Sequence, residues 1–360
     1  MNFGLVRRGY SATGGAEAYL KRFAQALGGA GHACTLFTSA DWPQEDWPGD
    51  RIERLPGNGP RAFANALERA RSKTPCDYLF SLERVRSCDA YRAGDGVHRA
   101  WLERRARFEP FWKRAGRLFN PKHRELLALE ERLFSPEGAG IVIANCRMVK
   151  EEIVRTYNYP AERIHVVYNG LPAFTPSPEL REATRARLGI SAATPVVLFA
   201  GSGWERKGLQ AAIDGIQQVP AACRPLLLVA GRGNPRRYRG GDRVRFLGPV
   251  REMVACYAAA DAFILPTLYD PFSNACLEAL AAGLPVITTT ANGFSEILTS
   301  GTDGEILDDP TDSTAVARAI EAWSDAERRA AIRPHLLELA SRFSIEANVR
   351  ETLAVTVGAS

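Results

Sequence analysis

The stretch ADAFILPTLYDPFSNACLEALAAGLPVITT, residues 260–289, contains the repeating unit that decides the fold. The apolar run Ala262–Leu265 predicts a buried strand, and residues 274–282 predict a helix that ends at the following glycine. A second apolar run, Val286–Thr289, predicts the next strand. A strand, a helix and a further strand joined by short turns are typical of a parallel α/β sheet.

The same alternation extends along the chain in both directions. Further strands are predicted at Phe3–Val6, Ala33–Thr38, Tyr78–Ser81, Ile141–Ala144, Val196–Ala200, Leu226–Ala230 and Val244–Phe246, with helices near 16–27, 208–218 and 251–259. An Asn-Gly pair and three prolines within residues 169–178 predict a domain boundary. We therefore predict an α/β protein with two Rossmann-like, doubly wound domains that face a central cleft, residues 1–170 and 171–342, and a helix of about 343–360 that packs on either domain.

The bulk composition is that of an ordinary soluble protein, with 46% hydrophobic and 24% charged residues. Seven dispersed cysteines without a CxxC pair predict reduced thiols, and five dispersed histidines argue against a structural metal. No apolar run approaches the roughly 20 residues of a membrane-spanning helix, and Arg7 and Arg8 follow the first apolar run rather than precede it. We therefore expect a cytoplasmic location.

Ligands of doubly wound sheets bind at the carboxyl ends of the strands, so the turns that follow the strands are the first places to inspect. The turn RRGYSATGGAE, residues 7–17, places Gly14 and Gly15 just before a helix, where the backbone can approach a ligand closely. A flexible loop ahead of a helix would give the same pattern. The GxGxxG spacing is missing, which argues against a nicotinamide-dependent dehydrogenase.

A second turn, AGSGWERKG at residues 200–208, places Arg206 and Lys207 at the start of a helix. Two cations oppose the helix dipole at that end unless an anion lies beside them. The pattern favours a diphosphate, which would bind the amides, the guanidinium and the ammonium together, over a solvated surface pair.

A third turn combines two carboxylates. Asp270 lies in the loop after a strand, Ser273 or Asn274 is placed to cap the next helix, and Glu278 lies about one turn inside it. Such carboxylates can accept hydrogen bonds from sugar hydroxyls on either side of a phosphate at the helix N-terminus. A turn-forming aspartate and a glutamate in a buried salt bridge would give the same spacing.

Taken in order, these motifs resemble those of the GT-B-fold retaining glycosyltransferases of family 4. The similarity covers nearly the whole chain: the glycine loop near the N-terminus, VVYNGL at residues 166–171, FLGPV at 246–250, YAAADAFILPT at 257–267 and DPFSNACLEALAAGLPVI at 270–287. Asp270 and Glu278 match the paired acids of the family. The family usually has two glutamates, so the aspartate departs from the pattern.

The resemblance implies a metal-independent hexosyl transfer without a cofactor, with an N-terminal acceptor-binding domain and a C-terminal domain that binds a nucleotide sugar. Arg206 and Lys207 would bind the donor diphosphate. Glu278 would hold the ribose, and Asp270 would hold the transferred hexose. The implied donor-binding residues are Gly14, Gly15, Arg206, Lys207, Val250, Arg251, Asp270, Phe272, Ser273, Asn274 and Glu278.

Within the family, CDAYRAGDGVHRAWLER at residues 88–104 is similar to a segment of the lipopolysaccharide-core glucosyltransferases that act on inner-core heptose. This resemblance implies UDP-glucose as the donor and a glycan or lipid-linked glycan as the acceptor, while UDP-galactose, UDP-N-acetylhexosamines, GDP-mannose and ADP-heptose stay open as donors. It places Asp95 near the reacting hydroxyl, with His98 as the rival. The implied catalytic residues are Asp95, Asp270 and Lys207.

Two other functions fit the same fold. A nucleotide-sugar epimerase of GT-B shape would need no acceptor, and a catalytically silent scaffold would only bind the nucleotide sugar. The Arg206-Lys207 pair and the paired acids argue against the epimerase, and the presence of every expected donor-site residue type argues against the scaffold.

The charge of the chain is unevenly distributed. Residues 1–170 contain 27 Lys and Arg against 20 Asp and Glu, which predicts an anionic partner such as a membrane, a phosphorylated glycan or nucleic acid. Residues 84–124 concentrate the excess, with 12 against 4 and five interleaved Trp and Phe side chains. We expect this segment to contact an anionic membrane peripherally, at the inner face of the cytoplasmic membrane, and we expect no nucleic-acid partner. The predicted membrane-facing residues are Arg104, Arg105, Lys113 and Arg114; a solvated basic helix with its aromatic side chains in the core is the alternative.

Overall fold

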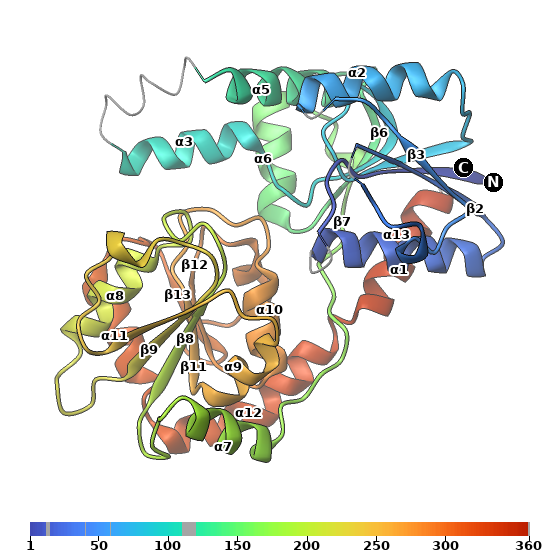
Figure 1. The fold of residues 1–360 in the computed structure, drawn as a ribbon. Helices are drawn as coiled ribbons and strands as arrows, with labels where there is room; N and C mark the ends of the chain where they lie inside the picture. The colour runs from blue at the N-terminus through green and yellow to red at the C-terminus, as the bar shows by residue number, and fades with distance from the viewer. Residues whose placement is uncertain (12–14, 40, 58, 110–119, 359–360) are drawn as a thin grey trace. The chain divides into compact units, whose positions relative to one another are not determined.

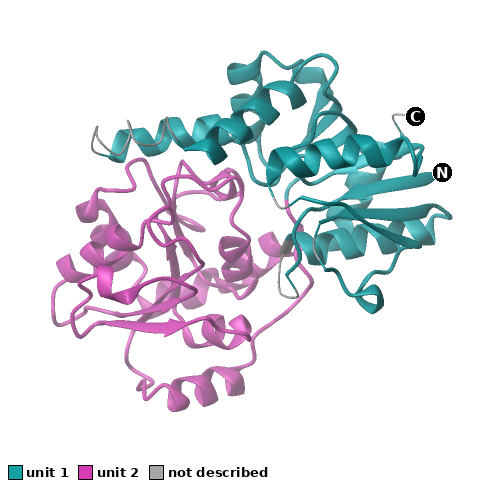
Figure 2. Cartoon of the chain, turned by 45° about the horizontal axis from the view of Figure 1, so that its top comes forward, with its two compact units in different colours: residues 1–168, 345–360 teal, residues 169–344 magenta. Residues whose placement is uncertain are grey.

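The computed structural model describes residues 1–11, 15–39, 41–57, 59–109 and 120–358. The chain divides into two compact units (Figure 2). Unit 1 consists of Met1–Tyr168 and Ile345–Ser360, and unit 2 consists of Asn169–Ser344. The division therefore falls next to the Asn-Gly pair, and the C-terminal helix belongs to unit 1.

Unit 1 is built on a parallel sheet of seven strands in the order β3-β2-β1-β4-β5-β6-β7. Its strands are β1 (Asn2–Val6), β2 (Ala33–Thr38), β3 (Arg51–Arg54), β4 (Tyr78–Ser81), β5 (Cys88–Arg92), β6 (Ala139–Ala144) and β7 (Ile164–Val166). Its helices are α1 (Gly15–Gly29), α2 (Pro60–Arg71), α3 (His98–Phe108), α5 (Pro121–Leu133), α6 (Arg147–Tyr157) and α13 (Ile345–Val357). In Figure 1, α1 and α13 lie together on one side of this sheet, and α2 and α5 lie together on the other.

Unit 2 is built on a parallel sheet of six strands in the order β10-β9-β8-β11-β12-β13. Its strands are β8 (Val196–Ala200), β9 (Leu226–Ala230), β10 (Val244–Gly248), β11 (Ala262–Leu265), β12 (Val286–Thr289) and β13 (Gly304–Leu307). Its helices are α7 (Pro178–Arg187), α8 (Leu209–Gln218), α9 (Met253–Ala259), α10 (Asn274–Ala281), α11 (Ser313–Ala322) and α12 (Ala326–Ser341). Both sheets therefore have the doubly wound order that the alternating pattern predicts.

All strands predicted from apolar runs are present, but the prediction missed β3, β5, β7 and β13. Three of these, β3, β7 and β13, are edge strands. A central strand of a parallel sheet is covered on both faces and is apolar along its length, whereas an edge strand is only partly covered. The sequence of β3, RIER, contains one apolar residue in four and gives no such signal.

The C-terminal helix α13 completes the core of unit 1. Ile345 and Val349 are buried in the same cluster as Phe3 and Leu20. The amide of Asn348 on α13 also donates a hydrogen bond to the carbonyl of Tyr168, the last residue before unit 2. The chain thus leaves unit 1 once and returns to finish its core.

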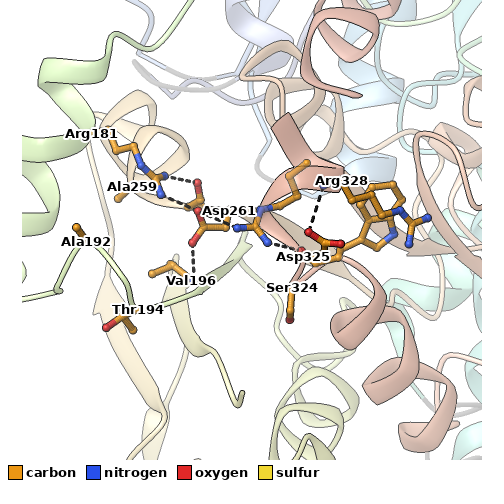
Figure 3. A network of polar contacts seen from close by, with 12 residues as sticks. Arg181, Ala192, Thr194, Val196, Ala259, Asp261, Ser324, Asp325 and Arg328 are labelled. Carbon is orange, nitrogen blue, oxygen red and sulfur yellow. Dashed lines mark hydrogen bonds and ion pairs between the residues drawn. The ribbon is translucent and has the colours of Figure 1, made fainter. Parts of the chain in front are cut away.

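A carboxylate that is only 12% exposed joins several elements of unit 2 (Figure 3). Asp261 directly precedes β11, and its Oδ2 accepts a hydrogen bond of 2.7 Å from the amide of Val196 at the start of β8. The same carboxylate pairs with Arg181 at 2.6 Å, Arg185 at 3.5 Å and Arg329 at 3.8 Å. One aspartate therefore connects two strands with helices α7 and α12.

These arginines also bind the carbonyls at helix C-termini. Arg181 donates to the carbonyls of Ala258 and Ala260, and Arg185 donates to that of Ala259, all at the end of α9. Positive groups are favourable at helix C-termini, where carbonyl groups lack intrahelical partners. These carbonyls hold the guanidinium groups in place but carry no net charge. The negative charge that neutralises the arginines comes from Asp261.

Replacing Asp261 by alanine should destabilise unit 2 by about 3–5 kcal/mol, because it leaves several guanidinium groups without their shared carboxylate. Urea unfolding followed by circular dichroism measures the change. Asp242→Ala, which removes an exposed carboxylate of the same unit, is the matched control and should change stability by less than about 0.5 kcal/mol. Equal stability of the two variants would contradict the role given to Asp261.

Candidate active site

The strand order of unit 2 reverses between β8 and β11, which are neighbours in the sheet. The chain leaves β8 toward β9 on one side and leaves β11 toward β12 on the other. The two loops after these strands, residues 201–208 and 266–273, therefore begin next to each other at the carboxyl edge. This is the position where doubly wound sheets bind ligands.

Gly208 lets these two loops lie against each other. It has a φ of 76°, and a Cβ on it would lie 1.8 Å from the carbonyl oxygen of Pro266. The hydroxyl of Thr267 and the amide of Leu268 both donate to the carbonyl of Arg206, at 2.9 and 2.8 Å. These hydrogen bonds attach the second loop to the backbone of the first loop, next to Arg206 and Lys207.

The two cations of the first loop meet the carboxylate of the second. Asp270 Oδ2 lies 3.5 Å from Lys207 Nζ and 3.7 Å from an Arg206 guanidinium nitrogen. Arg206 also donates to the carbonyl of Tyr269 at 2.6 Å. The diphosphate that the sequence predicts beside these cations stays a prediction, and in this structure the carboxylate of Asp270 lies there.

Asp270 is held by the segment that follows β12. Its amide donates to the carbonyl of Ala291, and its carbonyl accepts from the amide of Gly293, at 3.0 and 2.9 Å. The side chain of Asn292, which is fully buried, accepts from the amide of Ser273 at 3.2 Å. Asn292 was not predicted as a site residue, because it lies 22 residues after Asp270 and belongs to no recognisable local motif.

The predicted capping of α10 by a side chain was wrong in detail. Ser273 is the residue before the helix, but its buried hydroxyl accepts no hydrogen bond from an amide of the helix. The side-chain oxygen of Asn274 instead accepts from the amide of Asn169 at 2.8 Å. Asn274 is the first residue of the helix and not the residue before it, so its side chain is not at the N-cap position. Neither side chain therefore covers the N-terminus of α10.

Glu278 lies half-buried on α10 and accepts a hydrogen bond of 2.7 Å from the hydroxyl of Tyr257. Burial raises the pKa of Glu278, while the Tyr257 hydrogen bond and the charge of Lys207 act in the opposite direction. Among the described residues, Glu278 makes this hydrogen bond and not the buried salt bridge that was the alternative interpretation of the sequence. Lys207 thus influences both carboxylates of the site.

The other predicted donor-site residues are placed as follows. Phe272 is buried edge-on against Phe294, and Val250 and exposed Arg251 follow β10. Gly15 is the first residue of α1, and Gly14 lies outside the described residues.

Unit 1 has its own reversal of strand order, between β1 and β4. Arg7 follows β1 and pairs with Glu17 at 3.1 Å and with Glu83, which follows β4, at 3.0 Å. Burial raises the pKa of Glu83, and the neighbouring Arg7 and Arg8 act in the opposite direction. The charges around the first turn thus balance one another within the unit.

Asp95 and His98 lie close in sequence but differ in environment. The side chain of Asp95 is 70% exposed and lies 4.0 Å from a guanidinium nitrogen of buried Arg84. His98 is half-buried, with its Nε2 3.0 Å from Nδ1 of His123. Burial and the charge of Arg84 lower the pKa of His98 to about 4, so its ring is neutral near pH 7. The exposed carboxylate is the more accessible group of the two.

Glu130 holds these two groups in place. This fully buried carboxylate accepts from Arg84 at 2.9 Å and from the amides of His98 and Arg99, the first residues of α3. Arg84 donates in turn to the carbonyl of Gly96, next to Asp95. Because Glu130 lies at least 27 residues from each described residue that donates to its carboxylate, no local sequence pattern indicates its role.

The structure corrects one of the predicted membrane-facing residues. Arg104 pairs at 2.9 Å with Glu152 of α6, whose side chain is 1% exposed, so its charge is used inside the fold. Arg105 pairs with Glu109, the residue that follows its helix. Lys113 and Arg114 lie outside the described residues.

The described residues contain no group of three or more His, Cys, Asp or Glu side chains placed to hold a metal ion. They also contain no helix that is both long and apolar enough to cross a bilayer.

Comparison with known proteins gives two family models that match this chain. Residues 194–325 match the family model described as glycosyl transferases group 1, and residues 91–173 match the model of glycosyltransferase family 4. Together the matches cover more than half of the chain. The chain belongs to the family 4 glycosyltransferases of GT-B fold.

Individual relatives support this assignment. The chain is 23% identical over 325 residues to the lipopolysaccharide glucosyltransferase WaaG of Escherichia coli K12, over 84% of this chain and 83% of that protein. An uncharacterised glycosyltransferase of Methanocaldococcus jannaschii is 28% identical over 205 residues, and that match spans 53% of this chain and about half, 52%, of the relative.

Solved structures show the same fold. A crystal structure of WaaG matches with a TM-score of 0.84 and 20% identity, over 99% of this chain and 100% of that one. Anabaena HepE, solved in complex with UDP-glucose, matches with a TM-score of 0.75 and 19% identity, over the full length of both chains.

Replacing Tyr257 by phenylalanine should raise the pKa of Glu278 further. The change removes a hydrogen bond that stabilises the ionised carboxylate and leaves the burial unchanged. Glu278 would then ionise only at higher pH than in the wild type, which a carbon-13 NMR titration of the glutamate carboxyls measures. Tyr238→Phe, also in unit 2, should leave this titration unchanged; a lower or equal pKa in Tyr257→Phe would refute the prediction.

Proposed function

We propose that this protein is a retaining hexosyltransferase, which transfers a sugar from a nucleoside-diphosphate donor to a hydroxyl of a glycan acceptor. The proposal rests on the contact of Arg206 and Lys207 with Asp270 at the strand-order reversal of unit 2. The charge of Lys207 also lowers the pKa of Glu278, against the effect of burial. Two cations and two carboxylates at this position suit a ligand that combines phosphate with sugar hydroxyls.

Donor binding rests on the charges of this site. A donor diphosphate would bind Arg206 and Lys207 through charge-assisted hydrogen bonds, and it would meet the uncapped N-terminus of α10. Glu278 accepts hydrogen bonds as a carboxylate and is suited to the ribose hydroxyls. Asp270 would turn from its present ion pairs to the hydroxyls of the hexose.

In the transfer step the acceptor oxygen forms a bond to the anomeric carbon as the bond from that carbon to the diphosphate oxygen breaks. Attack from the face that the diphosphate leaves retains the configuration, and the leaving diphosphate oxygen takes the acceptor proton. Negative charge develops on the diphosphate, where Lys207 and Arg206 stabilise it without a metal ion. Asp95 of unit 1, the exposed carboxylate, would orient the acceptor hydroxyl.

UDP-glucose and the inner-core heptose of lipopolysaccharide are the substrates that we propose. Support comes from the similarity to WaaG, named as a lipopolysaccharide glucosyltransferase, and from the fold shared with HepE, solved with UDP-glucose. The excess of cations in unit 1 is consistent with an anionic acceptor.

The test is to incubate the protein with UDP-, GDP- and ADP-sugars, with and without a heptose-containing acceptor, and to add EDTA in a parallel series. We expect acceptor-dependent transfer from UDP-glucose that EDTA does not abolish. Epimerisation without an acceptor would favour the epimerase alternative, and binding without turnover would favour the silent scaffold.

Arg206→Ala and Lys207→Ala should each lower kcat/KM for the donor by about 10- to 100-fold, because each removes one charge-assisted hydrogen bond to phosphate worth roughly 1.5–3 kcal/mol. Steady-state kinetics with UDP-glucose measures the effect. Arg318→Ser, an exposed cation of the same unit, should retain wild-type kinetics. Near-normal activity of the Arg206→Ala/Lys207→Ala double variant would exclude the diphosphate assignment.

We further propose peripheral contact between the basic segment of unit 1 and an anionic membrane at the cytoplasmic face. Because Arg104 neutralises Glu152, replacing it would disturb the fold as well as the surface. Arg107 on the same helix is exposed and is the better choice. The proposal therefore rests on Arg107 together with Lys113 and Arg114.

The Arg107→Ser/Lys113→Ser/Arg114→Ser variant should bind anionic vesicles on the order of 100-fold more weakly than the wild type at low salt, as measured by flotation. The reason is that each basic residue near an anionic surface contributes about 1 kcal/mol of binding free energy. Raised salt should weaken the wild type as well. The control Arg69→Ser/Arg318→Ser/Arg350→Ser removes the same charge from exposed positions elsewhere. Equal flotation of the two variants would rule out a specific membrane-contacting segment.

A further inference from the structure

Unit 1 contains a cavity of about 620 Å³ that none of the predicted site residues lines. The cavity lies beside α2 and α5, which pack against each other on one side of the sheet (Figure 1). Arg61 lines it from α2, Arg124 and Arg132 from α5, and Arg86 from the loop between β4 and β5. Glu125 is the single carboxylate among its described lining residues.

Three of the four guanidinium groups, those of Arg61, Arg86 and Arg124, have no carboxylate partner among the described residues. Arg86 donates twice to the side-chain oxygen of Asn65, at 2.9 and 2.7 Å, which is an uncharged partner. Arg61 and Arg124 make no side-chain ion pair or hydrogen bond with any residue in the described part of the chain. Arg132 alone pairs with a carboxylate, that of Glu137 at 2.5 Å. The lining therefore has a clear excess of positive charge.

The helix ends add to this positive potential. Helix α2 begins at Pro60 and α5 begins at Pro121, and neither has an acidic residue in its first turn. A Cβ on Gly59 would lie 3.8 Å from Glu125 Oε2, so the start of α2 lies close to the first turns of α5. Cations in the first turn oppose the helix dipole, and Arg61 and Arg124 occupy these positions in the two helices.

We propose that this cavity binds the phosphate group of a small phosphorylated ligand, either a sugar phosphate or free phosphate. Arginine matches phosphate in geometry because its planar fork donates two parallel hydrogen bonds. The volume is that of a small-molecule site rather than of a single surface contact. The apolar side chain of Leu129 in the lining suits a ligand larger than the phosphate itself. The site lies in unit 1, and it does not depend on the donor site proposed for unit 2.

The test is isothermal titration of the full-length Arg206→Ala/Lys207→Ala protein, so that the second phosphate-binding candidate is removed from the measurement. Glucose 6-phosphate, inorganic phosphate and glucose are the probes. We expect binding of the phosphorylated probes and none of glucose. Tighter binding of glucose 6-phosphate than of inorganic phosphate assigns the site to a sugar phosphate, and the reverse order assigns it to free phosphate.

Adding Arg61→Ser/Arg124→Ser should weaken the binding at least 10-fold, and both residues are exposed, so the fold should be retained. The matched control Arg69→Ser/Arg350→Ser removes the same charge from exposed positions outside the cavity and should bind as its parent does. The proposal is overturned if neither phosphorylated probe binds, if the two variants bind equally, or if Arg61→Ser/Arg124→Ser reduces only the flotation with anionic vesicles.

Discussion

A parallel sheet brings the carboxyl ends of its strands to one edge, and the rest of this molecule follows from where the strand order reverses at that edge. In unit 2 the reversal separates β8 from β11, so two successive loops begin side by side. Gly208, where a Cβ would clash with the carbonyl oxygen of Pro266, allows those loops to pack against each other. The contact of Lys207 and Arg206 with Asp270 is the chemical outcome of that geometry.

Buried carboxylates connect elements that are distant in sequence. Asp261 joins the starts of β8 and β11 to arginines of α7 and α12, and Glu130 joins Arg84 to the beginning of α3. Each carboxylate is satisfied by several donors, which is the condition for keeping a charge in a low-dielectric interior. These interactions locate the loops that carry the site residues, although they contribute no side chain to the site itself.

The two units use the same architecture with different charge. At the reversal of unit 1, Arg7 is balanced by Glu17 and Glu83, and the unpaired arginines lie instead beside α2 and α5. At the reversal of unit 2, Arg206 and Lys207 share the carboxylate of Asp270. The same sheet topology therefore carries different charge arrangements, because the loops and not the strands supply the charges.

The sequence by itself determined the central strands other than β5, the helices α1, α8, α9 and α10, the division near Asn169 and the loops that contain Arg206, Lys207, Asp270 and Glu278. These features rest on local patterns: continuous apolar runs, helical spacing and glycines at turns. Only the tertiary structure decided which groups pair. It placed α13 in the core of unit 1, gave Glu278 the hydroxyl of Tyr257, and used Arg104 to neutralise Glu152. The topology of the connections between strands determines these side-chain partners. Residues far apart in sequence therefore come into contact although no local sequence pattern indicates it.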